Sequence, residues 1–419
     1  MSVNDDDSAL AEGLRGILTP YQHERLGVAV SGGSDSMALL HLLADWRADG
    51  GPELCAVTVN HGLRAGAARE AAGVARICGE LGIPHETRVW AGWDHKGNLQ
   101  DQARRARLRL IAQWAKDRGI AMVALGHTAD DQAETFVMRL ARGSGVDGLA
   151  AMSEWRNAEG ITWVRPVLGV RRWELRDYLH RRAVRWFDDP TNEDDSFDRV
   201  KIRKALAVLD PLGITAKSLS QASSRLHSAR VVLCQYAHDQ ARHFASVDAG
   251  DVVFVRSGLG TVLKETRNRL LVHALLWVSG AEYRPRQNAV ETLWQAVEDQ
   301  RSTALHGCRV LVTPEDIRIT REYSAVKDIV AAPGMAWDSR WRVSGPLASG
   351  YEVRALGETG LLACPDWRDT GRTRTTLIAS PAIWQAENLL AAPLAGLAAG
   401  WRVFLARADE DFFTSLIAH

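Results

Sequence analysis

The sequence predicts an α/β protein with a parallel-sheet domain at the N-terminus, a helical domain after it and a mixed α/β domain at the C-terminus. Through the first part of the chain, short β-branched runs alternate with longer segments of helical periodicity, which is typical of βαβ units. After residues 210 and 211, Asp-Pro, helical periodicity dominates, and alternating stretches begin near residue 303. We therefore expect domains at 1–210, 211–302 and 303–419.

Hydrophobic periodicity locates the individual elements. In the first domain we expect strands at residues 26–30, 54–59, 85–90, 121–125 and 163–167. Apolar residues three and four apart predict crossover helices at residues 36–46, 67–81, 100–118 and 130–142. In the second domain we expect helices and no strands, with helices at 218–244, 262–278 and 287–297, and in the third hairpin strands at 308–313, 316–321 and 341–343.

Composition favours a soluble, cytoplasmic protein without a membrane anchor. The 419 residues are 46% hydrophobic and 24% charged, which are globular values, and the length suggests two or three domains. The acidic start has no positive region followed by an apolar stretch, as a secretion signal would. The most apolar segment, residues 389–400, is broken by Pro393 and is too short to cross a membrane.

Cysteine spacing and net charge exclude simple metal and nucleic-acid interpretations. The five cysteines are far apart, so we expect reduced thiols packed as small hydrophobic groups: Cys55, Cys78, Cys234, Cys308 and Cys364. Because the formal net charge is zero, a nucleic-acid partner has to be argued from local clusters. Two arginine clusters exist, one at residues 104–109 and one at residues 165–185.

A glycine loop between a strand and a helix is the strongest indication of a ligand site. It consists of Ser31, Gly32, Gly33, Ser34, Asp35 and Ser36. Adjacent glycines let successive backbone N–H groups point at one spot, and the helix start adds partial positive charge, so we expect a phosphate there. Asp35 is a candidate Mg²⁺ ligand. The alternative is an ordinary turn in which Ser34 or Asp35 caps the helix.

The lysine of a Walker loop and the spacing of a dinucleotide fingerprint are both absent from this loop. A second group of polar residues follows the strand expected at 121–125 and includes His127, Asp131 and Glu134. Open α/β sheets bind ligands along the edge where strands end, so these side chains are candidates for acid–base chemistry or metal binding. A plainer explanation is that Thr128 and Asp131 form a capping box, which is compatible with such a role.

A third segment, residues 188–203, is an acidic turn followed by a basic helix, which by itself is typical of a solvated surface. Together the three segments resemble the tRNA(Ile)-lysidine synthetase family of the N-type ATP pyrophosphatase (PP-loop) superfamily, over about residues 24–205. The superfamily match rests on residues 31–36. The narrower match rests on residues 61–64, 102–107, 126–135, 142–145, 165–166, 189–192 and 197–203.

The resemblance implies a PP-loop ATPase fold and a two-step reaction. ATP activates the C2 oxygen of the wobble cytidine in the isoleucine tRNA with anticodon CAU and releases pyrophosphate, and L-lysine then displaces AMP to form lysidine. Residues 31–36 would bind ATP with Mg²⁺ near Asp35, and His127, Asp131 and Glu134 would handle the adenylate and lysine. Arginines would contact phosphates of ATP or tRNA: Arg104, Arg107, Arg199 and Arg203. The tRNA backbone would contact Arg171, Arg172 and Arg176.

Two positions depart from the family pattern. The family usually has Asp where this chain has Asn60, and an aromatic residue where it has Leu108; Asn60 therefore receives no role. The alternatives are another PP-loop enzyme, such as a tRNA thiolase or an amidating synthetase, and a non-catalytic RNA-binding protein. A thiolase normally needs a reactive cysteine, and none lies near the motifs. A homodimer is a further expectation.

Overall fold

The computed structural model describes residues 3–20, 25–62, 66–91, 99–188, 198–346 and 350–417. The chain forms two compact units, residues 1–230 and residues 231–418. The division falls inside one long helix, α9 (Ala216–Phe244). It coincides with neither of the boundaries expected at 210 and 302.

The first unit alternates strands and helices, as expected. Its elements are α1 (Val3–Leu18), β1 (Arg25–Ala29), α2 (Ser34–Ala48), β2 (Glu53–Asn60), α3 (Ala67–Glu80), β3 (His85–Val89), α4 (Leu99–Asp117), β4 (Met122–Leu125), α5 (Ala129–Leu140), α6 (Val146–Leu149), β5 (Trp155–Ala158), β6 (Ile161–Val164), α7 (Arg172–Arg181), α8 (Asp198–Leu209) and the 3-10 turn η2 (Asp210–Leu212). Expected and observed elements agree within a few residues, except that sequence analysis did not predict α1, α6 and β5.

The strand expected at 163–167 instead ends at Val164. Leu168 donates its backbone N–H to the carbonyl of Arg165, which closes a turn. Pro166 has no N–H to continue a strand ladder. The apolar run therefore continues beyond the strand without being part of it.

One six-stranded sheet organises the first unit, with strand order β3-β2-β1-β4-β6-β5. All neighbours are parallel except the β5–β6 hairpin. Strand β1 pairs with β2 on one side and with β4 on the other, so the chain reverses its direction of winding between β1 and β4. Ligands of open α/β sheets bind at such a switch point, beyond the carboxyl ends of the strands.

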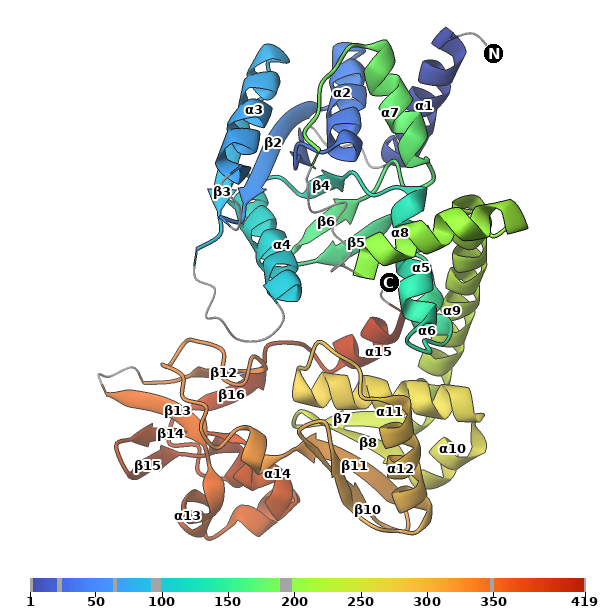
Figure 1. Ribbon diagram of the computed structural model, residues 1–419. Coiled ribbons are helices and arrows are strands. Elements are labelled where there is room, and N and C mark those ends of the chain that lie inside the picture. Colours follow the sequence, from blue (N-terminus) through green and yellow to red (C-terminus); the bar gives the residue numbers. More distant parts are fainter. Residues whose placement is uncertain are drawn as a thin grey trace. The chain divides into compact units, whose positions relative to one another are not determined.

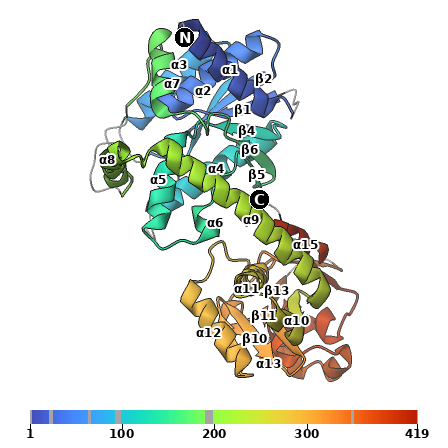
Figure 2. The ribbon, with the colours of Figure 1, turned by 90° about the vertical axis from the view of Figure 1, so that its right-hand side faces the viewer.

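Helices cover both faces of this sheet (Figures 1 and 2). On one face α1, α2, α3 and α7 enclose a core that includes Val28 and Ala56. On the other face α4 packs its Trp114 and Ile111 against Val57 and its neighbours. Ala56 and Val57 are adjacent in β2 but lie in different cores, because successive strand residues point to opposite faces.

The second unit contains antiparallel sheets with helices packed against them. Its elements are β7 (Ala245–Asp248), β8 (Asp251–Val255), α10 (Arg256–Thr261), α11 (Lys264–Ser279), α12 (Gln287–Glu298), β9 (Thr303–Leu305), β10 (Cys308–Val312), β11 (Asp316–Arg321), η3 (Tyr323–Ala325), β12 (Trp341–Ser344), β13 (Tyr351–Ala355), α13 (Gly357–Leu362), η4 (Trp367–Thr370), α14 (Arg374–Ile378), β14 (Pro381–Gln385), β15 (Asn388–Ala391), η5 (Pro393–Ala395), β16 (Arg402–Leu405) and α15 (Glu410–Ile417).

Sequence analysis predicted no strands between residues 211 and 302, and this prediction is wrong. Strands β7 and β8 belong to the sheet β7-β8-β11-β10-β9, which joins residues on both sides of position 302. These strands have only four and five residues, too few for alternation to distinguish them from the helical segments beside them. The long-range partner β11 completes the sheet.

Two expectations from composition can be compared with the structure. Among the described residues, no helix is long and apolar enough to cross a membrane. None of the five cysteines forms a disulfide bond, and four of them are buried. The expectation of reduced thiols packed as small hydrophobic groups is therefore confirmed for those four.

Gly126 provides a test of how closely β4 must approach α2. A Cβ atom at this position would lie 3.0 Å from the backbone carbonyl carbon and oxygen of Asp35. Gly126→Ala should therefore lower the free energy of unfolding by about 1–3 kcal/mol, measured by denaturant unfolding. Gly79→Ala is the control, because its Cβ would meet nothing within 4 Å; in helix α3 it should be neutral or stabilising by up to about 1 kcal/mol. Equal stability of the two variants would contradict the close approach.

Candidate active site

The loop after β1 forms a phosphate-sized turn at the start of α2. Gly32 has φ +90°, a conformation that favours glycine. The Ser36 hydroxyl donates to the Gly33 carbonyl at 3.0 Å and accepts the Ser31 N–H at 3.1 Å. Ser36 thereby fixes the loop, while the first turn of α2 leaves backbone N–H groups without helical partners. The expected strand, glycine turn and helix are all present.

Phe187, which sequence analysis missed, closes the outer side of this loop. Its N–H donates to the Gly32 carbonyl at 3.0 Å. A Cβ on Gly32 or Gly73 would meet the Phe187 ring at 3.0 Å or 2.4 Å, so the ring packs against both glycines. No local pattern links residue 187 to residue 32, and only the folded chain brings them together.

The loop after β4 provides the second half of the site. Thr128 caps α5 in a capping box with Asp131: Asp131 Oδ2 accepts the Thr128 N–H at 2.9 Å and its hydroxyl at 3.0 Å. The other oxygen of Asp131 faces α7 and accepts from Arg172 at 3.2 Å. Capping and a role in the site, which sequence analysis found compatible, therefore use different oxygens of one carboxylate.

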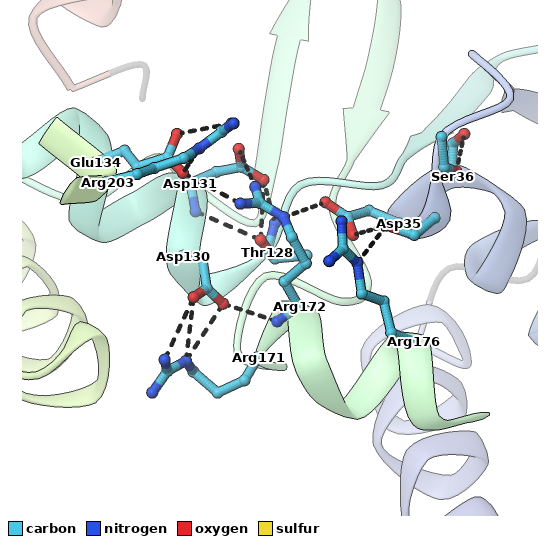
Figure 3. A network of polar contacts seen from close by, with 12 residues as sticks. Asp35, Ser36, Thr128, Asp130, Asp131, Glu134, Arg171, Arg172, Arg176 and Arg203 are labelled. Carbon is cyan, nitrogen blue, oxygen red and sulfur yellow. Dashed lines mark hydrogen bonds and ion pairs between the residues drawn. The ribbon is translucent and has the colours of Figure 1, made fainter. Parts of the chain in front are cut away.

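Arg172 joins the two halves (Figure 3). Its Nε donates to Asp35 Oδ2 at 2.9 Å, its Nη2 to Asp131 Oδ1 at 3.2 Å and its Nη1 to Glu134 Oε1 at 3.2 Å. Burial alone would lower the pKa of Arg172, but the three carboxylates together raise it. Arg172 is therefore permanently charged, and it is the positive centre of the site.

Burial and nearby positive charge shift the pKa of the neighbouring acids in opposite directions. Burial raises the pKa of Asp35 above its ordinary value, and the ion pair with Arg172 only partly offsets this. Burial would also raise the pKa of Asp131, but Arg172 and the hydrogen bonds from Thr128 outweigh it and lower the pKa. Asp131 is therefore held as a carboxylate.

Glu134 is the most deeply buried acid of the site, with only 1% of its side chain exposed. Besides Arg172, it accepts from Arg203 Nε of α8 at 2.6 Å. A buried carboxylate is stable only when it is paired. The contact explains why α8 packs against α5, and it brings Arg203 to the site as the sequence suggested.

Arg171, just before α7, and Arg176, within it, also have partners near the site. Arg171 Nε pairs with Asp130 at 3.2 Å, and Asp130 also accepts the Arg172 N–H at 2.7 Å. Arg176 donates to the Ser34 hydroxyl at 3.4 Å. These side chains hold α7 against the two site loops. The tRNA contact expected for Arg171, Arg172 and Arg176 stays a prediction.

A group of arginines lies beside the acids. Burial lowers the pKa of Arg107, and the nearby charges of Arg104 and Arg199 lower it further. The buried Nε of Arg107 has no hydrogen-bond partner in the part of the chain that the structure describes. A buried guanidinium nitrogen without a hydrogen-bond partner, with two further arginine charges close by, favours binding of an anion.

His127 contacts Arg165 rather than an acid. Arg165 Nε donates to His127 Nδ1 at 3.2 Å, and burial, followed by the positive charges nearby, lowers the pKa of His127. Because the Nδ1 accepts, the neutral ring carries its proton on Nε2. His127 is thus a hydrogen-bond donor at Nε2 and no longer a good candidate for the base.

The carboxylates can also be tested as ligands of Mg²⁺. No group of three His, Cys, Asp or Glu residues placed to hold a metal occurs among the described residues. Mg²⁺ is commonly held by one or two carboxylates together with substrate phosphates and water. Asp35, at the mouth of the phosphate loop, fits this mode.

Parts of three sequence motifs lie outside the described residues: Arg64, residues 189–192 and Phe197. Asn60 and Leu108 are the two residues that differ from the family pattern. Asn60 accepts the Gly62 N–H at 2.9 Å, and Leu108 packs against the core beside α4. Both have a structural role in this fold. Neither contact involves the acids of the site.

Known proteins are similar to this chain in sequence. The PP-loop domain family matches residues 7–209. The tRNA(Ile)-lysidine synthase of Ruegeria pomeroyi is 48% identical over 410 residues, which cover 98% of each chain. The enzymes of the same name from Bradyrhizobium diazoefficiens and Wolbachia pipientis are 41% and 32% identical, over 65% and 77% of this chain and 78% and 77% of theirs.

A sheet with its switch point between β1 and β4, and a glycine loop that enters α2 there, define a PP-loop protein. The class is confirmed by the match over the first unit. The relatives define the class more narrowly, since the Ruegeria pomeroyi enzyme matches 98% of the chain and the Wolbachia pipientis enzyme 77%. The protein belongs to the tRNA(Ile)-lysidine synthase family.

His127 predicts a pH dependence of stability. Since its pKa is lowered on folding, the unfolded chain takes up a proton first as the pH falls, and stability is lost below about pH 6.5. Between pH 7 and pH 5, wild type should lose up to about 2 kcal/mol more than His127→Gln. Urea unfolding at both pH values measures the difference. If wild type and His127→Gln lost equal stability between pH 7 and pH 5, His127 would be protonated in the folded protein at pH 5.

Proposed function

We propose that the protein ligates L-lysine to C2 of the wobble cytidine of the isoleucine tRNA with anticodon CAU, using ATP. The cytidine C2 oxygen attacks the α-phosphate, and pyrophosphate leaves; the lysine amine then attacks C2, and AMP leaves. The observation that carries the proposal is the meeting of a phosphate loop with Asp131 and Glu134 at one sheet edge, in a chain of this family.

The phosphate loop suits the leaving group of the first step. Negative charge builds up on pyrophosphate as it leaves, so backbone N–H groups and the start of α2 stabilise it where it forms. Mg²⁺ held by Asp35 would supply further positive charge to the phosphates. Arg176 and the Ser34 hydroxyl lie at the same helix start.

The acids suit the second step. Lysine attacks as a neutral amine, so a nearby group has to accept a proton. The acceptor nitrogen of His127 already accepts a hydrogen bond from Arg165. Asp131 and Glu134 are therefore the candidates for accepting the proton. Arg203, paired with Glu134, lies where the carboxylate of an amino acid could also bind.

The arginine group suits an RNA phosphate. Arg107 has an unpartnered Nε among the described residues, and Arg104 and Arg199 add charge beside it. Guanidinium groups bind phosphate through charge-assisted hydrogen bonds and position the RNA without reading its sequence. Cytoplasmic location and a homodimer are further parts of the proposal.

One assay tests the reaction itself. The protein is incubated with ATP, Mg²⁺, labelled lysine and total tRNA, and label is expected in RNA together with pyrophosphate. Pyrophosphate release without lysine in RNA would favour another PP-loop enzyme. A thiolase would need an accessible reactive cysteine, and burial raises the pKa of the Cys78 and Cys308 thiols to about 11 and about 12.

Two variants separate the two halves of the site. Ser36→Ala removes the hydroxyl that fixes the phosphate loop and should raise the KM for ATP roughly tenfold. Glu134→Gln should lower turnover by at least about 100-fold while tRNA binding is kept, as measured by filter binding. Glu80→Gln, which removes an exposed acid paired with Arg76, is the control. Normal turnover in Glu134→Gln would remove Glu134 from the proposed mechanism.

A further inference from the structure

The Arg172 guanidinium lies among three carboxylates and supplies the positive charge that pairs with them. Each of its three nitrogens donates to a different acid, Asp35 on α2 and Asp131 and Glu134 on α5. About 20% of the Arg172 side chain is exposed, and 19% of that of Asp35. Without Arg172, the ion pair of Arg203 with Glu134 would offset part of the repulsion among the three acids.

Asp35 has no idle oxygen in this arrangement. Its Oδ2 accepts from Arg172 at 2.9 Å, and its Oδ1 accepts from the Ser34 hydroxyl at 3.0 Å. A metal ion that binds Asp35 has to share an oxygen with one of these donors or displace that donor. A divalent cation and a guanidinium on one carboxylate also repel each other strongly at this separation.

Neutral Ser34 can turn away at little electrostatic cost, but doing so would leave Mg²⁺ beside Arg172. If Arg172 moves instead, it keeps Asp131 and Glu134 as partners. Arg172 is the first residue of α7, and its backbone N–H donates to Asp130. This bond holds the Cα of Arg172 in place while its long side chain changes partners.

We propose that Arg172 is a positioning residue that competes with Mg²⁺ for Asp35. Before the nucleotide arrives, Arg172 links the phosphate loop to the acids of α5. Binding of the metal–nucleotide complex transfers Asp35 to the metal and leaves Arg172 with Asp131 and Glu134. The phosphate half and the amine half of the site are thereby coupled. The inference rests on the proposed function for the placement of Mg²⁺ at Asp35.

Mn²⁺ is a direct probe of this competition because its free ion has an electron paramagnetic resonance signal. The full chain is titrated with Mn²⁺ in the presence of α,β-methylene-ATP, and a titration of the nucleotide alone is subtracted. Arg172→Gln should lower the Kd for Mn²⁺ roughly tenfold, since a close positive charge is removed. Arg172→Lys, which keeps the charge but not the three-way contact, should lower it roughly threefold.

Arg171→Gln is the matched control. It removes the same charge one residue away, but Arg171 pairs with Asp130 and not with Asp35. Its Kd for Mn²⁺ should be that of wild type. An equal gain in Arg171→Gln would show a general effect of net charge and would overturn the proposal.

Thermal unfolding provides the second measurement. Arg172→Gln should unfold at a lower temperature than wild type without metal, and Mn²⁺ with the nucleotide analogue should raise its Tm more than that of wild type. A purely structural ion pair predicts lost stability that metal does not restore. Unchanged or weaker Mn²⁺ binding in Arg172→Gln and Arg172→Lys would overturn the proposal. Neither measurement uses lysine or tRNA, so failure of lysine incorporation in wild type counts only against the proposed function.

Discussion

The parallel pairing of β1 with β4 is the constraint on which the site depends. Val28 and Ala29 lie opposite Ala124 and Leu125, so both strands end at the same level of the sheet. The loops that follow them, separated by nearly 100 positions in the sequence, therefore begin side by side. Gly126 then allows the second loop to approach the backbone of α2 at a distance that a side chain would prevent.

Charge pairing builds on that geometry. The carboxylates at the sheet edge are partly or fully buried, and a buried acid without a partner would be costly. Arg172 and Arg203 supply the partners from α7 and α8, which ties two later helices to a sheet formed earlier in the chain. The same contacts that stabilise the fold therefore place the acids where a reaction can use them.

One residue of the site combines a contact that stabilises a helix with a contact in the proposed active site. Asp131 caps α5 with one oxygen and contacts Arg172 with the other. Its lowered pKa depends on both contacts. A capping role and the proposed functional role of Asp131 are consequently compatible, as the sequence indicated.

The sequence by itself determined the alternating strands and helices of the first unit, the glycine loop and the candidate acids, because these depend on local periodicity and on residues close together in the chain. Only the tertiary structure decided that Arg172 lies among three carboxylates, that Phe187 packs on Gly32, and that β7 and β8 complete a sheet with β11. Each of these depends on partners far away in the sequence. A long, flexible arginine is compatible with many partners, and strand order and helix packing select which of them it meets.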